Sequence, residues 1–269
     1  MRNSCDILIK YDELTFLDYF KKALGNLGFE PLFMDIFFDE FHRPKDDLEY
    51  DEEYLMELLS KKIKPQSIMI KNSVYAEGEP YYWLRISLRN DDEFITTLGK
   101  NYLFEWSNRD LNFIIDNGFL KEILNSSPFI YCFCFDSADA YQYRDISHDK
   151  KERDKQRKSD YSRYTSVRDC GFVAAAEMWF SELYNPVFDI LYFNKFKYAD
   201  FGECAGQTIC HIKLFDLYAD PSLPENRAKQ KAYWNLLITH NVFENYEKNN
   251  EIDFDEWVRI KCKRKKSKG

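Results

Sequence analysis

The chain has 269 residues, of which 45% are hydrophobic and 31% charged, and its formal net charge is -8 at pH 7. The 23 Phe and 19 Tyr residues, beside only nine Gly, argue against a low-complexity or disordered protein. The seven cysteines are an odd number spread along the chain, which argues against a disulfide framework and favours a reducing compartment.

Two further features concern the cell compartment and the distribution of charge. No run approaches the roughly 18 consecutive apolar residues of a membrane span, and residues 1–6 are too polar to begin a secretory signal, so we expect a cytoplasmic protein that does not bind membranes. The segment 259–269 is a basic tail with seven Lys or Arg and no acid. The body of the chain is therefore more acidic than its net charge suggests.

The first half of the chain mixes short strands with helices. The apolar spacing predicts strand 6–11, helix 13–27, helix 52–63, strands 67–74 and 81–89, helix 108–124 and strand 129–135. A turn at 77–80 would join the strands on either side of it into an antiparallel pair. The run 129–135 is apolar throughout, which predicts a strand covered on both faces.

The second half begins with a mixed-charge stretch at 144–169. Beyond it we predict helix 172–184, strands 187–193 and 208–218 separated by a turn at 202–206, helix 224–238 and strand 254–262. The order of elements lacks regular strand-helix alternation and a Gly-rich nucleotide loop. It therefore favours an α+β fold with one or more mixed, mainly antiparallel sheets and packed helices. Residues 1–258 would form either one globular domain or two packed lobes divided near 144–169.

The most unusual part of the sequence is an acidic, aromatic window between Asp35 and Glu57. It holds ten carboxylates against two basic residues. Such a surface suits a cationic protein partner, because charge speeds and orients encounter while aromatic rings supply contact area. The predicted partner-binding carboxylates are Asp39, Glu40, Asp46, Asp47, Glu49, Asp51, Glu52 and Glu53, and the predicted aromatic anchors are Phe38, Phe41 and Tyr50.

Metal and catalytic chemistry find less support in the sequence. The carboxylates of the acidic window lack the spacing of a calcium loop, and the four histidines lack zinc-ligand spacing. His211 follows Cys210 in a predicted strand, so the two side chains would face opposite ways. Cys132 and Cys134 alternate with aromatic residues, which favours small core hydrophobes over redox chemistry. We predict no cofactor and no metal, and a protein that is not an enzyme.

Two alternatives to a protein-binding role remain open. One is a carboxylate-dependent or metal-dependent hydrolase whose carboxylates the sequence does not single out. The other is a nucleic-acid-binding defence protein that uses 144–168 and the basic tail. The interleaved acidic residues of 144–169 weaken the second alternative, because they reduce counterion release on binding a phosphate backbone.

Two segments of the carboxyl-terminal half carry a resemblance. Residues 172–180 (FVAAAEMWF) and 217–234 (LYADPSLPENRAKQKAYW) resemble bacterial immunity proteins of interbacterial toxin systems. The resemblance implies a cytoplasmic protein that binds a cognate toxin and blocks its active site or its assembly. Together with the acidic window, it leads us to expect an inhibitory binding protein for a basic toxin. The sequence leaves the oligomeric state open.

Overall fold

The computed structural model describes a sheet of ten strands, together with helices. The described residues are 3–10, 30–38, 45–60, 65, 67–71, 82–89, 101–108, 124–125, 128–136, 139, 173–185 and 187–242. Only the backbone is described for the first strand, for the sixth strand and, apart from Ile86, for the fifth. These ranges contain the α+β architecture that the sequence predicts, with antiparallel strand pairs and helices.

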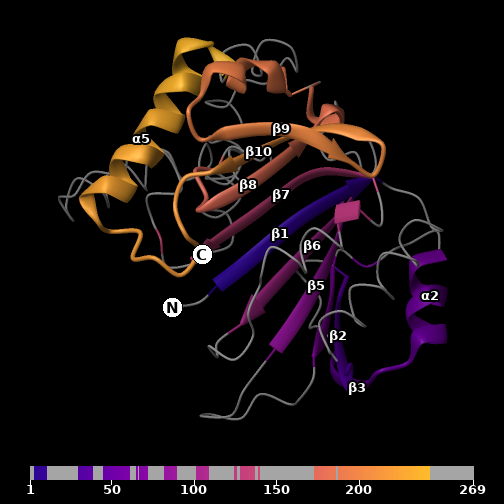
Figure 1. Ribbon diagram of the computed structural model, residues 1–269. Coiled ribbons are helices and arrows are strands. Elements are labelled where there is room, and N and C mark those ends of the chain that lie inside the picture. Colours follow the sequence, from indigo (N-terminus) through magenta and orange to yellow (C-terminus); the bar gives the residue numbers. More distant parts are fainter. Residues whose placement is uncertain are drawn as a thin grey trace, which may run out of the picture.

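Every pair of neighbouring strands in the sheet is antiparallel. The strands are β1 (Asn3–Lys10), β2 (Phe33–Phe37), β3 (Lys45–Glu49), β4 (Ser67–Lys71), β5 (Tyr82–Arg89), β6 (Asn101–Asn108), β7 (Phe129–Asp136), β8 (Glu177–Ser181), β9 (Ala199–Cys204) and β10 (Gln207–Lys213). Their order across the sheet is β3-β2-β4-β5-β6-β1-β7-β8-β10-β9. Figure 1 shows β3 and β9 at opposite margins of this sheet.

Two α-helices lie toward opposite ends of the sheet (Figure 1). The helix α2 (Glu52–Ser60) begins where Asp51 accepts a hydrogen bond from the backbone N–H of Tyr54, as an N-cap residue does. The helix α5 (Pro224–Thr239) begins with a proline, whose missing N–H costs nothing in the first turn. The predicted starts of both helices are confirmed.

The core beside α2 comes from cross-strand pairs on one face of β2, β4 and β5. Met34 pairs with Ile70, and Ile36 and Ile86 flank Ile68. All five side chains are buried, as are three leucines of α2: Leu55, Leu58 and Leu59. The antiparallel pairing of β4 with β5 was predicted and is confirmed. It places the alternate apolar residues of these strands on one buried face.

The core beside α5 is aromatic. The strand β7 is buried along its whole length, as its unbroken apolar sequence predicts. Phe180 of β8 lies opposite Tyr131 of β7 and contacts Phe193 of the 3₁₀-helix η3 (Ile190–Lys195). Phe193 in turn stacks on Tyr233 of α5, with the ring centroids 5.7 Å apart. Stacked and edge-to-face rings thus join the sheet, η3 and α5 in one cluster.

Three predicted elements differ in the structure. The helix predicted over 172–184 is wrong, because Glu177–Ser181 forms β8 and Glu182–Tyr184 forms the short 3₁₀-helix η2. The strand predicted over 187–193 is also wrong, because η3 occupies Ile190–Lys195. The predicted turn at 202–206 begins too early, since β9 extends to Cys204 and only Ala205 and Gly206 separate it from β10. The strands β2, β3, β6 and β9 were not predicted.

Several predictions fall elsewhere in the chain. The predicted helix 13–27, the turn 77–80, the strand 254–262, the stretch 144–169 and the tail 259–269 lie outside the described residues, as does nearly all of the helix 108–124. β7 precedes the stretch 144–169 and β8 follows it, and the two strands pair with each other. The division into one domain or two lobes stays a prediction.

Candidate functional site

Residues 45–57 of the acidic window form the edge strand β3 and the first part of α2. Six of its carboxylate side chains are exposed: Asp46, Glu49, Asp51, Glu52, Glu53 and Glu57. We call these six residues the acidic surface. Asp39, Glu40 and Phe41 lie outside the described residues. Five residues of the acidic surface are predicted partner-binding carboxylates: Asp46, Glu49, Asp51, Glu52 and Glu53. They are close together because α2 begins shortly after β3 ends.

Part of the acidic surface has a structural reason. Asp51 is the N-cap of α2, and Glu52 and Glu53 occupy its first turn. Carboxylates at these positions are favourable because they face the positive end of the helix dipole. Glu49 has no such role and projects from the edge strand, where a charged residue also discourages strand pairing between molecules. Fewer carboxylates are therefore available solely for binding a partner than the sequence suggests.

Asp47 differs from its neighbours because it belongs to a buried ion network. Its carboxylate and that of Asp35 both accept hydrogen bonds from the Lys71 ammonium, at 2.5 and 2.6 Å. The Lys71 side chain is 5% exposed and that of Asp35 10%, whereas that of Asp47 is 45% exposed. Its backbone N–H also donates to Asp35 Oδ1. Asp47 is thus partly committed to the fold, and Lys71 would compete with any cationic partner for its charge.

A bulge in β3 gives Asp47 this position. Leu48 lies opposite Met34 and Lys45 lies opposite Ile36, so two residues of β3 face the single residue Asp35. Asp47 takes a φ of 52°, a left-handed conformation that aspartate adopts more readily than most residues. The bulge turns the Asp47 carboxylate toward Lys71 of β4. No local pattern in the sequence predicts this contact, because its two residues are far apart in the chain.

The two described aromatic anchors, Phe38 and Tyr50, both pack against the core. Each is half-buried in the free protein, so only part of each ring is available to a partner. The Tyr50 hydroxyl is buried and has no hydrogen-bond partner in the part of the chain that the structure describes. Burial, and then the nearby carboxylates of Glu52 and Asp51, raise the pKa of Tyr50 to about 12. Tyr50 therefore stays neutral at physiological pH.

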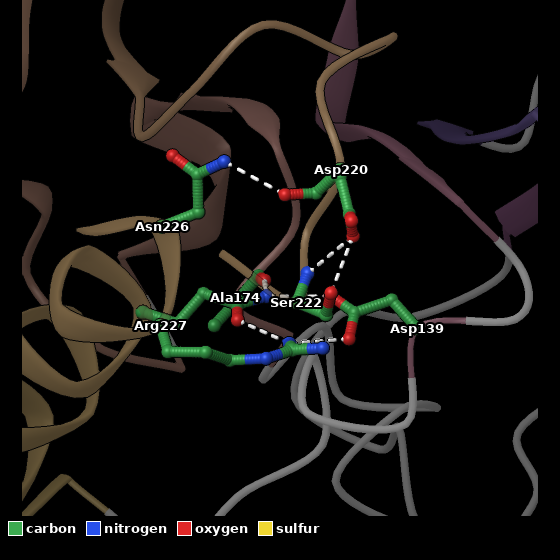
Figure 2. Close-up of polar contacts among 7 residues, drawn as sticks. Asp139, Ala174, Asp220, Ser222, Asn226 and Arg227 are labelled. Atoms are coloured by element: carbon green, nitrogen blue, oxygen red, sulfur yellow. Dashed lines mark hydrogen bonds and ion pairs between the residues drawn. The ribbon is translucent and has the colours of Figure 1, made fainter. Parts of the chain in front are cut away.

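A second polar cluster joins α5 to the sheet. Arg227 and Gln230 of α5 both donate hydrogen bonds to the buried carboxylate of Asp139, which follows β7. Gln230 also donates to the carbonyl oxygen of Ala174, just before β8. Figure 2 shows the Arg227 guanidinium reaching Asp139 beside Ala174. The cluster satisfies a buried charge and anchors the first half of α5.

The loop before α5 supplies a turn of its own. Asp220 accepts hydrogen bonds from the backbone N–H and the hydroxyl of Ser222, and its carbonyl oxygen accepts one from Asn226 (Figure 2). The bonds from Ser222, with a smaller effect of Arg227, lower the pKa of the Asp220 carboxyl. The segments 172–180 and 217–234, which carry the resemblance to immunity proteins, thus meet in space through Gln230 and Ala174.

A third cluster pairs Glu177 of β8 with His211 of β10. His211 Nε2 lies 2.9 Å from a carboxylate oxygen of Glu177, and Lys213 Nζ lies 3.8 Å from the same oxygen. The imidazole stacks on the Trp179 ring at a centroid distance of 4.6 Å. Sequence reasoning missed Glu177 as the partner of His211, because the two residues meet only through the pairing of their strands.

The cysteines of β7 and β10 take the positions that the sequence predicts. Cys132 and Cys134 are wholly buried, which confirms them as core residues. Cys210 is buried on the face of β10 opposite to His211, also as predicted. Burial, with a smaller effect of Asp200, raises the pKa of the Cys210 thiol to about 12. A thiol in this state is a poor nucleophile at neutral pH.

Comparison of the chain with protein-family models, with curated proteins and with solved structures found no match. Within the described ranges, no three His, Cys, Asp or Glu side chains lie close enough together to hold a metal ion. None of the described helices is both long enough and apolar enough to cross a membrane.

Proposed function

We propose that this protein is an inhibitory binding protein of the immunity type, which neutralises a cognate basic toxin in the cytoplasm. The observation that carries the proposal is the acidic surface, because its exposed carboxylates gather where β3 passes into α2. A field of this kind attracts and orients a cationic protein before contact. The half-buried rings of Phe38 and Tyr50 lie in the same part of the chain and would add apolar contact area.

The charges that bind a partner must be separated from those that hold the fold. Glu49 and Glu53 suit this purpose better, since both are exposed and Glu53 stabilises α2 only through its first-turn charge, as Glu225 does in α5. Asp51 and Asp47 do not, because they cap α2 and pair with Lys71. The test variant is therefore E49K/E53K.

The experiment begins with capture of partners by the tagged full chain from its native cells. Each captured protein is then expressed alone and together with the wild-type chain. We expect one captured protein to arrest growth and the wild-type chain to restore it. We expect E49K/E53K to lose this rescue and to associate about tenfold more slowly at low salt, with the difference shrinking as salt screens the charges.

The matched control is E225K. Glu225 is an exposed glutamate in the first turn of α5, as Glu53 is in the first turn of α2, and the two helices lie toward opposite ends of the sheet (Figure 1). E225K should retain rescue and rate. Equal rescue by wild type and E49K/E53K would show that the acidic surface does not bind the toxin. A set of captured proteins that never arrests growth would overturn the immunity role itself.

A further inference from the structure

The strand β9 is the margin of the sheet opposite to the acidic surface (Figure 1). It joins β10 through a turn of two residues, Ala205 and Gly206, whose φ angles are 50° and 73°. Two positive φ angles mark a type I′ turn, which closes a regular hairpin. In such a hairpin the residues flanking the turn, Cys204 and Gln207, exchange backbone hydrogen bonds. This pair determines which backbone groups of β9 face outward.

Because Cys204 bonds to β10, every second residue before it along β9 directs its backbone N–H and C=O groups away from β10. These residues are Glu203, Phe201 and Ala199. The Ala199 N–H donates to the Phe196 carbonyl oxygen, as an outward-facing group is free to do. The N–H and C=O groups of Phe201 and Glu203 have no partner in the part of the chain that the structure describes. Two consecutive outward positions of β9 are thus open to a further strand.

Sheet margins are usually protected against pairing with other chains. The margin at β3 carries a bulge and a lysine, Lys45. In contrast, β9 pairs with β10 without any shift of register from Cys204 to Ala199, and it contains no lysine or proline. Phe201 is 38% exposed, which is high for a phenylalanine. The regular backbone and the exposed ring make β9 the less protected margin.

The side chains of β9 define what would fit beside it. Asp200 and Glu203 are exposed and lie on opposite faces, because they are three residues apart in a strand. Phe201 shares the face of Glu203. A side chain added at Gly202 would meet no atom within 4 Å, so the space above this residue is open. A strand paired with β9 would therefore face the carboxylates of Asp200 and Glu203, the Phe201 ring and the open space at Gly202.

We propose that β9 binds an extended basic segment of a partner protein, which adds to the sheet as an eleventh strand. The backbone of the segment would bond the outward groups of Phe201 and Glu203, and its side chains would supply specificity. Read antiparallel to β9, the segment carries Lys or Arg opposite Glu203, any residue opposite Gly202, an apolar residue opposite Phe201, and Lys or Arg opposite Asp200. This site is independent of the acidic surface and of the function proposed for it.

A second copy of the same chain fits β9 less well. Antiparallel self-pairing must bring outward residues opposite each other, so it would centre on Phe201 or on Gly202. The first register places Asp200 diagonal to Asp200 of the other copy, and the second places Glu203 diagonal to Glu203 of the other copy. Like charges this close across a strand pair are unfavourable, and either register gathers four carboxylates into one short ladder. Charge complementarity therefore selects a basic segment.

The test uses the full chain and a synthetic peptide, acetyl-Thr-Lys-Thr-Val-Lys-Val-Thr-amide, with a matched peptide in which both Lys are Glu. Backbone amide exchange is followed by NMR. At saturating basic peptide, we expect the exchange of the Phe201 and Glu203 amides to slow at least about tenfold. The acidic peptide should produce no change. Failure of the basic peptide to slow these two amides would overturn the proposal.

Three variants separate backbone pairing from charge. E203P removes an outward N–H that the protein's own sheet does not use, together with the Glu203 carboxylate, whereas E203Q removes the carboxylate alone. The strand β9 should persist in both, and peptide affinity should be about tenfold or more lower for E203P than for E203Q. E203K keeps the N–H and should favour a peptide with Glu in place of the facing Lys. E225K and E49K/E53K should bind the basic peptide like the wild type. Equal affinity of E203P and E203Q would contradict pairing at this edge.

Two results would assign the edge to another occupant and overturn the proposal. One is concentration-dependent dimerisation of the peptide-free chain, abolished by E203P, which would identify a second copy. The other is slow exchange of the Phe201 and Glu203 amides without peptide, made fast by deleting 259–269, which would identify the basic tail of the same chain.

Discussion

Lys71 shows how a single residue ties the acidic window to the fold. Its ammonium is buried between Asp35 and Asp47, and it neutralises part of the negative charge that the sequence concentrates there. A buried charge of this kind contributes little net stability when paired, because desolvation offsets the attraction. Removing one partner is different, since the remaining charge stays buried and unpaired.

The first prediction concerns this network. K71M should lower the free energy of unfolding by about 3 kcal/mol, because it leaves the buried Asp35 carboxylate without its counter-ion. Urea denaturation followed by circular dichroism measures the change. D47N is the control and should cost less than about 1 kcal/mol, since this carboxylate is 45% exposed. The double variant D35N/K71M should recover part of the loss. A cost below about 1 kcal/mol for K71M would refute the importance of the network.

Residues with local reasons for their positions were the ones that sequence reasoning placed correctly. Cys132 and Cys134 alternate with aromatic residues, and this pattern alone predicts their burial. Asp51 precedes an apolar helical pattern and caps it. Glu177 lacks any local signal for its contact with His211, because the contact depends on the register of β8 against β10. In the candidate site, a local pattern explains the position of Asp51, whereas the contact of Asp47 with Lys71 depends on the pairing of strands.

At the scale of elements, the prediction for α5 was correct, whereas the helix predicted over β8 was wrong. The helix α5 matches its prediction because a proline start and a polar outer face mark it locally. The segment around β8 is buried at every position from Val173 to Ser181, so it has no polar face that could reveal its period. Its alanines favour a helix, but pairing with β7 on one side and β10 on the other satisfies its backbone as a strand.

The second prediction concerns the attachment of α5. R227M should lower the free energy of unfolding by about 3 kcal/mol, because Asp139 stays buried with its negative charge no longer balanced by the guanidinium. It should also speed amide exchange in the first half of α5 relative to the core strands. K231M, which changes an exposed lysine of the same helix, should have little effect on either measurement. Similar values for R227M and K231M would show that the Asp139 contact does not anchor α5.

At the scale of the whole molecule, one antiparallel sheet connects two differently built parts of the hydrophobic core. Aliphatic residues of β2 and β4 face the core beside α2, whereas aromatic rings dominate the core beside α5. The two margins of the sheet differ as well, since β3 is bulged and acidic and β9 is regular with an exposed ring. The proposed partner surfaces therefore lie at opposite ends of the same sheet.

The third prediction is a loss of stability at alkaline pH. Burial raises the pKa of Cys210 and Tyr50 to about 12, and it raises the pKa of Tyr233 in the same direction. A raised folded-state pKa means that the neutral form stabilises the folded protein. This stability is complete below the unfolded-state pKa, about 9 for the thiol and about 10 for the phenol, and is lost as pH rises toward 12.

Urea unfolding at a series of pH values between neutral and strongly alkaline measures this loss. Y50F and C210A should each flatten the decline above about pH 9. At neutral pH, Y50F should cost little stability, because the Tyr50 hydroxyl has no hydrogen-bond partner to lose among the described residues. A decline that is the same in wild type and in both variants would show that these two groups do not control it.

The sequence by itself determined the start of α2, the pairing of β4 with β5 and the helix α5, because an acidic or proline helix start, a turn signal and side-chain alternation are local patterns. It also determined the unbroken apolar character of β7 and the concentration of charge between Asp35 and Glu57. Only the tertiary structure decided that the acidic window becomes an edge strand, that Asp47 turns inward to Lys71 and that 177–181 is a strand. Strand ladders and buried ion pairs join residues distant in sequence, so no local pattern encodes them.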